Sequence, residues 1–236
     1  RDPEMSRGLG DVYKRQDISY LSKRARKMLD EAGLQCCKIV ASNSLDEYLI
    51  RDLMMQEAKI DTFGVGERLI TAKSAPVFGG VYKLAAVEDE QGNIIPKIKI
   101  SENTTKITNP HYKKLYRFYD NESGKALADE LCVYDETIDG TKPHTIFDPD
   151  AIWKTKTLTD YSVKELHVTV FKNGELVYKQ PSLFEIKRYC AEQTETLWDE
   201  VKRFENPHTY YVDLSKKLWD IKNELLEKSK DGKGLK

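Results

Sequence analysis

Residues 37–47 read Cys37-Lys-Ile-Val-Ala-Ser-Asn-Ser-Leu-Asp-Glu47, a short apolar run followed at once by a pattern that starts helices. The run over residues 37–41 predicts a buried strand, because it is brief and apolar. Ser44 and Glu47 have the spacing of a capping box, in which two side chains satisfy free backbone N–H groups at a helix start. A strand that leads straight into a helix is the basic step of an α/β fold.

Two further elements flank this step. Residues 18–33 carry apolar side chains at helical spacing and end in Gly33, which suits a helix C-terminus. Residues 60–63, Ile60-Asp-Thr-Phe63, predict a second short strand. Helix, strand, helix and strand with short connections are typical of a parallel α/β sheet or barrel. Only about two such units are present, which is too few for a whole barrel.

After Gly79-Gly80 the pattern changes to hairpins. Turn sequences that predict hairpins lie at Gln91-Gly-Asn93, Asn121-Glu-Ser-Gly124 and Lys172-Asn-Gly174. The expected strand pairs are 81–87 with 94–100, 114–119 with 126–134, and 163–171 with 175–178. Residues 136–156, which hold two prolines and an Asp-Gly pair, predict a long loop.

Two helices are expected after the hairpins. Ser182 and Glu185 form a second capping-box match. Two apolar stripes follow at helical spacing, Leu183, Ile186, Cys190, Leu197, Val201 and Phe204, then Leu214, Leu218, Ile221 and Leu225. This periodicity predicts that both stripes belong to the core.

Composition excludes several classes of protein. The chain has 236 residues, of which 39% are hydrophobic and 33% charged, and its net charge is −1. No apolar run approaches the ~20 residues of a membrane helix, and a bulk electrostatic argument for nucleic acid is absent. The four cysteines form no C-x-x-C pair, which favours thiols in a reducing cytoplasm over structural zinc.

The ends of the chain differ from the rest. Residues 1–16 resemble a translated sequencing-adapter peptide, with a native disordered arm as the alternative. Residues 230–236 are polar and predict a disordered tail. Between them we expect residues 17–86 to be a remnant of an α/β barrel and residues 87–229 to form a C-terminal domain of hairpins and helices.

The best candidate site follows the second predicted strand, at Phe63-Gly-Val-Gly-Glu-Arg68. Gly64, Val65 and Gly66 would let the backbone approach a ligand and point N–H groups at a phosphate. The alternative is a tight turn between strand and helix. Ser42 and Asn43 follow the first strand and would lie at the same edge, and the negative charge of Glu67 would oppose a phosphate unless it pairs with Arg68 or points outward.

No catalytic nucleophile emerges from spacing. The four histidines, His111, His144, His167 and His208, stand in no recognisable triad. Cys36-Cys37 could take part in redox chemistry, although the start of a strand explains the pair more simply.

Several segments, taken together, carry a family resemblance. They are Ala41–Glu47, Phe63–Thr71, Gly79–Leu84, Lys97–Asn103, Lys106–Pro110, Leu197–Phe204 and Tyr210–Leu214. In this order they resemble bacterial nicotinate phosphoribosyltransferases, from about Asp17 to Ser229.

The resemblance implies the C-terminal part of a type II phosphoribosyltransferase, an irregular α/β barrel followed by a β-rich segment and two helices. Such enzymes join nicotinate to phosphoribosyl pyrophosphate in NAD salvage, with ATP hydrolysis and Mg²⁺, as cytoplasmic homodimers. It implies that Ser42, Asn43 and Gly64–Glu67 hold the phosphate of the phosphoribosyl group, and that Asp17 lies on the ribose and metal side.

The match departs from the family in three places. Asp17 corresponds to the last residue of the family's Asp-Ser-Gly-Asp segment, and Lys14-Arg15-Gln16 replace the others. Glu67 stands where many members have Thr, which leaves only the backbone as a phosphate contact there. The family's phosphorylated His and nicotinate-binding residues are expected upstream, so we expect this chain alone to be inactive.

Two alternatives remain. One is a related phosphoribosyltransferase that uses nicotinamide or quinolinate. The other is a binding module derived from the barrel, without catalytic activity.

Overall fold

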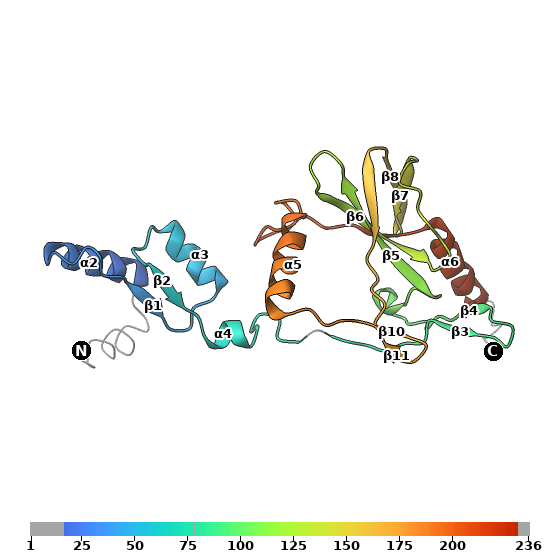
Figure 1. Cartoon of the computed structure of the whole chain (residues 1–236), viewed down its shortest axis with the longest axis horizontal. Helices are drawn as coiled ribbons and strands as arrows, with labels where there is room; N and C mark the ends of the chain where they lie inside the picture. Colours follow the sequence, from blue (N-terminus) through green and yellow to red (C-terminus); the bar gives the residue numbers. More distant parts are fainter. Residues whose placement is uncertain (1–16, 78, 231–236) are drawn as a thin grey trace. The chain divides into compact units, whose positions relative to one another are not determined.

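The computed structural model describes residues 17–77 and 79–230. The chain divides into two compact units, residues 1–81 and 82–236. Figure 1 shows α2 to α4 in the first unit, in blue and cyan, and β3 to α6 in the second, in green to red. Predictions on residues 1–16 and 231–236 lie outside the described part of the chain.

The first unit has the predicted alternation of helix and strand. Its elements are α2 (Ile18–Glu31), β1 (Val40–Ser42), α3 (Glu47–Met55), β2 (Thr62–Gly64) and α4 (Glu67–Ile70). β1 and β2 pair in parallel, with Val40 opposite Thr62 and Ser42 opposite Gly64. Two strands do not close a barrel, and within the described residues the first unit holds only these two.

The start of α3 corrects the predicted capping box. Asp46 caps the helix, because its carboxylate accepts a hydrogen bond from the Leu49 N–H at 2.8 Å. Ser44 instead lies in the turn after β1, where Asn43 and Ser44 have φ values of 110° and 49°. Aspartate caps helices as well as serine does, so the cap can lie at Asp46, two residues after Ser44. The strand before it then extends to Ser42.

The first predicted strand is also more exposed than expected. Val40 is 63% exposed, and among the described residues of this unit the buried apolar ones are Leu45 and Leu53. A two-stranded sheet has few neighbouring elements to cover its faces, so an apolar run in it need not be buried. The prediction of a buried strand is therefore wrong for this structure.

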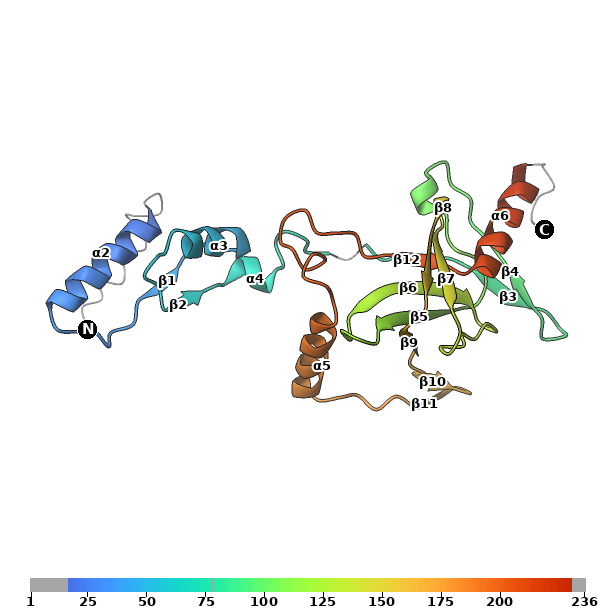
Figure 2. The same cartoon turned by 90° about the horizontal axis from the view of Figure 1, so that it is seen from above.

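The second unit is built on a mixed four-stranded sheet. Its order is β12-β6-β5-β9, formed by Val212–Leu214, Ala126–Val133, Lys113–Asp120 and Tyr161–Glu165. β5 pairs antiparallel with β6 and β9, whereas β12 pairs in parallel with β6. Figure 2 shows β12 beside β6, and α6 (Lys216–Lys230) follows β12 directly.

Three smaller two-stranded ladders belong to the same unit. They are β3 (Ala86–Glu88) with β4 (Ile94–Pro96), β7 (His144–Asp148) with β8 (Ala151–Leu158), and β10 (Phe171–Lys172) with β11 (Glu175–Leu176). A short 3₁₀ turn, η1, spans Thr104–Lys106. All three predicted hairpins are confirmed, although β3 and β4 are shorter than expected and the run over 163–171 is divided between β9 and β10.

The β7–β8 hairpin corrects the predicted long loop. Its strands occupy about half of residues 136–156, with an antiparallel register from His144 and Leu158 to Asp148 and Ala151. The prolines that suggested a loop lie just outside the strands, before β7 and in the turn between the two strands. Proline is found at the ends and turns of hairpins as well as in loops, and this explains the wrong prediction.

Two small apolar clusters form the core of the second unit. Phe118, Ala128, Ile146, Leu158 and Tyr161 pack together where β7 and β8 meet the main sheet. The Phe118 and Tyr161 rings lie 5.4 Å apart in a T-shaped arrangement. Val133, Leu214 and Leu218 join the sheet to α6.

The two C-terminal helices differ in burial. α5 (Leu183–Glu195) begins with the predicted capping box at Ser182 and Glu185. It ends before Leu197 and holds no buried residue, so the prediction of a core stripe up to Phe204 is wrong. In α6 Leu218 and Leu225 are buried, which confirms the second stripe, and Lys230 is helical although the tail was predicted to start there. Among the described helices, none is long and apolar enough to cross a membrane.

Candidate functional site

The predicted phosphate site lies at the carboxyl edge of the parallel pair in the first unit. Ser42 ends β1 and is followed by Asn43, while Gly64 ends β2 and is followed by Val65–Glu67. The parallel register places Ser42 opposite Gly64, so the two segments leave the sheet at the same edge. In α/β sheets this edge is where ligands commonly bind.

Gly64 is needed for the close approach of these strands. The Ser42 hydroxyl donates a hydrogen bond to the Gly64 carbonyl at 3.2 Å. A Cβ atom added to Gly64 would lie 3.1 Å from the Ser42 Oγ and 3.2 Å from its Cβ. This packing supplies a structural reason for Gly64, independent of any ligand.

Free backbone donors gather just after Gly64. The N–H groups of Val65, Gly66, Glu67 and Arg68 donate to no other described residue, whereas the Gly66 carbonyl accepts from the amides of Leu69 and Ile70 in α4. Consecutive amides of this kind can hold an oxyanion. The turn is therefore chemically suited to a phosphate.

The charged side chains next to this turn are paired. Arg68 forms an ion pair with Asp46, the residue that caps α3. Glu67 lies 3.3 Å from the Lys73 ammonium, so its charge is offset by Lys73 and not by Arg68. Both members of the second pair are largely exposed, and such pairs contribute little to stability.

Asp17, the expected ribose-side residue, caps the first helix. Its carboxylate accepts a hydrogen bond from the Tyr20 N–H at 3.1 Å. Within residues 17–77 and 79–230, no group of three or more His, Cys, Asp or Glu side chains is arranged to hold a metal ion.

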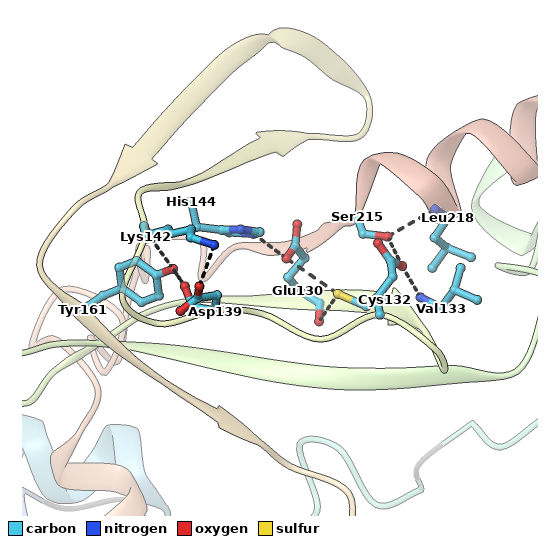
Figure 3. Close-up of polar contacts among 10 residues, drawn as sticks. Glu130, Cys132, Val133, Asp139, Lys142, His144, Tyr161, Ser215 and Leu218 are labelled. Carbon is cyan, nitrogen blue, oxygen red and sulfur yellow. Dashed lines mark hydrogen bonds and ion pairs between the residues drawn. The ribbon is translucent and has the colours of Figure 1, made fainter.

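The second unit contains a buried polar cluster that spacing did not reveal (Figure 3). Glu130 on β6 is 2% exposed, and its carboxylate lies 2.8 Å from the His144 Nε2. His144 stacks on Phe118 with the ring centres 5.1 Å apart. Cys132 lies with its sulfur 3.6 Å from the same carboxylate.

Cys132 is not a nucleophile in this setting. Burial, followed by the negative charge of Glu130, raises the pKa of its thiol well above the ordinary value. The reactive form of cysteine is the thiolate, and this environment disfavours it. The Glu130–His144 pair therefore lacks an activated partner and serves to satisfy a buried carboxylate.

The remaining contacts of the cluster join elements. The Glu136 carboxylate accepts hydrogen bonds from the Val133 N–H at 2.6 Å and the Ser215 hydroxyl at 2.7 Å. Ser215 in turn accepts from the Leu218 N–H at the start of α6 (Figure 3). The cluster fixes the start of α6 against β6, which is a structural role.

A second buried carboxylate, Asp129, is held by the segment before β12. Arg117 contacts both oxygens of Asp129, at 2.7 and 2.9 Å, and the Tyr210 hydroxyl donates to one of them at 2.8 Å. Burial and the Asp129 charge raise the pKa of Tyr210, so it stays protonated as a donor. Sequence reasoning missed both buried clusters, because the partners come from strands that pair only in the folded sheet.

Comparison with known proteins finds a family match in the second unit and similar relatives across most of the chain. Residues 112–222 match the family described as nicotinate phosphoribosyltransferase C-terminal domain. The nicotinate phosphoribosyltransferase of Bacillus subtilis is 41% identical over 91% of this chain and 44% of its own length. That of Dictyostelium discoideum is 35% identical over 89% and 37%, respectively.

The fold comparison agrees with these sequence matches. The crystal structure of human nicotinic acid phosphoribosyltransferase superposes with a TM-score of 0.67 at 24% identity, over 89% of this chain and 39% of that one. The chain thus spans less than half the length of these relatives.

Proposed function

We propose, on the premise that residues 112–222 carry the nicotinate phosphoribosyltransferase C-terminal domain, that this chain serves in an enzyme of that activity. The enzyme would join nicotinate to phosphoribosyl pyrophosphate, giving nicotinate mononucleotide and pyrophosphate. Hydrolysis of ATP to ADP and phosphate would be coupled to this reaction, in the salvage of nicotinate to NAD. Two relatives that match about nine-tenths of this chain are themselves named nicotinate phosphoribosyltransferases, which supports this proposal.

The part of this chain in the reaction would be to hold the phosphoribosyl group. The single observation that carries this assignment is the row of free N–H groups from Val65 to Arg68, next to the end of β1. These donors would bind the 5-phosphate, with Ser42 and Asn43 nearby and Asp17 on the ribose side. Positioning and fixed dipoles of this kind stabilise a ribosyl centre that becomes positively charged as pyrophosphate leaves.

The remaining parts of the enzyme would come from outside the described residues. The phosphorylated His and the groups that bind nicotinate are expected in sequence that this chain does not contain. Mg²⁺ would neutralise pyrophosphate charge in the whole enzyme, with Asp17 on the ribose and metal side. We further propose a cytoplasmic homodimer, irregular-barrel architecture for the catalytic domain, and no nucleic-acid or membrane partner.

A proline substitution tests the phosphate site directly. Glu67 is the first residue of α4, a position where proline is tolerated because its N–H is free. Glu67→Pro removes that donor, whereas Glu67→Ala keeps it and removes only the carboxylate. Nicotinate mononucleotide would be titrated into each folded full chain and followed by amide chemical shifts over residues 63–68.

We expect Glu67→Pro to weaken binding about tenfold, the loss of one charge-assisted hydrogen bond. Glu67→Ala should bind at least as tightly as the unchanged chain, because a repelling charge is gone. Equal loss in both variants, or no shift at residues 63–68, would contradict the assignment.

The choice of base is tested in the full-length parent enzyme. Product formation from nicotinic acid with phosphoribosyl pyrophosphate and ATP is the expected result. Product from nicotinamide or quinolinate but not from nicotinic acid would overturn the substrate assignment and leave the phosphate site untouched.

A further inference from the structure

A cavity of about 240 Å³ lies within the C-terminal unit, which contains none of the residues assigned to the phosphate. Leu127 of β6 and Ile146 and Phe147 of β7 give it an apolar wall, and Asp213 of β12 lines it as well. All of its lining residues belong to residues 82–236.

Asp213 is unusual among the buried acids of this unit. It is 5% exposed, yet its carboxylate forms no hydrogen bond or ion pair with any other described residue. The neighbouring buried acids are satisfied, Asp129 by Arg117 and Tyr210, and Glu130 by His144. The Asp213 carboxylate lines the cavity and has no partner among the described residues, so it is free to accept hydrogen bonds from a molecule that enters the cavity.

The charges around Asp213 define what that donor can be. Asp148 also lines the cavity, and Glu130 lies opposite Asp213 in the β6–β12 register. Burial, then repulsion by these two carboxylates, raises the pKa of Asp213 to about 6. The only cations that line the cavity are Lys154, which pairs with Asp148 at 3.6 Å, and Lys156, which is exposed. Above pH 6 Asp213 is therefore a carboxylate without an ion pair, although the two lysines balance the net charge of the lining.

We propose that this cavity binds a small organic ammonium ion, whose N–H groups donate to Asp213 and whose apolar body packs against Leu127, Ile146 and Phe147. An organic cation fits better than a metal ion, because no group of three or more ligating side chains is arranged for a metal among the described residues. It fits better than an anion, because the buried wall of the cavity carries the carboxylate while both lysines lie toward solvent. Small-molecule sites typically have this composition, mostly apolar with few polar groups that fix orientation.

Three probes of equal size test the proposal in the full 236-residue chain. Benzylamine, benzyl alcohol and benzoate would each be titrated at pH 7.5 and followed by amide chemical shifts. We expect benzylamine to bind with a Kd of roughly 1 mM, in the range of small fragments, with shifts at residues 127, 146–148 and 211–213. Benzyl alcohol should bind at least tenfold more weakly, and benzoate should not shift these residues.

Two variants separate Asp213 from general charge. Asp213→Asn should weaken benzylamine binding at least tenfold. Asp150→Asn makes the same change in net charge at an exposed residue that does not line the cavity, and it should leave the Kd within twofold.

A pH series on the unchanged chain gives an independent readout that needs no variant. The groups that face Asp213 are Asp148, Glu130 with its partner His144, and Lys154 and Lys156 across the cavity. Protonation of Asp213 should weaken benzylamine binding about tenfold between pH 7.5 and pH 5. Binding that is independent of pH, equal for benzylamine and benzyl alcohol, or unchanged in folded Asp213→Asn would overturn the proposal.

Discussion

Buried carboxylates in the C-terminal unit differ in how they are stabilised. Asp129 is held by a bidentate arginine and a tyrosine, and Glu130 by a histidine. Asp213 has no such partner, and burial with nearby carboxylates raises its pKa to about 6. The three residues lie on two adjacent strands, so buried carboxylates at similar positions in one sheet differ in their hydrogen-bond partners.

The stability of the C-terminal unit should depend on pH through Asp213. Its pKa is about 6 in the folded chain, above the ordinary value of 3.8, so the folded state binds more protons between these limits. Stability is then full below about pH 4 and falls as the pH rises through 6, by up to about 3 kcal/mol. Asp213→Asn should remove this loss, so the variant is more stable than the unchanged chain at pH 7.5.

Urea unfolding followed by tryptophan fluorescence at pH 4.5 and 7.5 measures this effect. The tryptophans all lie in the C-terminal unit, so the signal reports that unit. Asp150→Asn is the control and should keep the fall in stability. A parallel pH dependence in both variants would contradict the assignment to Asp213.

Gly64 should be intolerant of a side chain. Gly64→Ala places a methyl group 3.1 Å from the Ser42 Oγ and should destabilise the β1–β2 pair by about 1–2 kcal/mol. Gly80→Ala is the matched control, because a Cβ at Gly80 has no atom within 4 Å. Hydrogen exchange of the β1 and β2 amides would measure both, and equal protection in the two variants would contradict the argument.

At the scale of elements, the local sequence predicted the positions of strands more accurately than the burial of those elements in the fold. The helix–strand alternation indicated the parallel pair of β1 and β2, and turn sequences located three hairpins. The β7–β8 hairpin was missed because Pro143 and Pro149, which border β7, resemble loop residues. The exposure of α5 was not predicted, because helical periodicity identifies an apolar face but does not show whether another element packs against it.

The candidate site shows the same division. That Ser42 and Gly64 meet follows from two parallel strands of known order, so the sequence was sufficient to bring them together. The pairing of Glu67 with Lys73 and the cap at Asp46 depend on side-chain choices within the turns. Glu130 and His144 could not be paired, because residues 136–156 were expected to form a loop.

The cap of α3 can be tested as an element. Asp46→Ala should cost the first unit about 1 kcal/mol through loss of the cap, whereas Ser44→Ala should cost little because Ser44 does not cap the helix. Asp46→Asn keeps an acceptor for the Leu49 N–H and separates the cap from the ion pair with Arg68. Amide exchange over residues 49–55 measures each, and a larger effect from Ser44→Ala than from Asp46→Ala would restore the original capping box.

At the scale of the whole molecule, the chain forms two units, and each unit has its own small apolar core. Leu45 and Leu53 are the buried apolar residues in the described part of the first unit, and the clusters around Phe118 and Leu218 form the core of the second. Large apolar side chains remain exposed in both, including Val40 at 63% and Phe184 at 81%. The relatives that this chain matches are more than twice as long, and their additional sequence is where the remaining catalytic groups are expected.

The isolated chain should therefore show no turnover. Purified residues 17–229, supplied with nicotinate, phosphoribosyl pyrophosphate and ATP, should form no nicotinate mononucleotide above background, because the expected phosphorylated His is not in this sequence. The full-length parent enzyme is the positive control. Robust synthesis by the isolated chain would show that the catalytic groups lie within it after all.

The pairing of β12 with β6 also affects how the protein can be synthesised. Asp129 of β6 pairs with Val212, which is synthesised 83 residues later in the chain. At translation rates of about 5–20 residues per second, that edge of β6 stays unpaired for several seconds or more on the ribosome. During this interval the unpaired edge of β6 can pair with other chains. We therefore expect chaperones to be needed until β12 has been synthesised and has paired with β6.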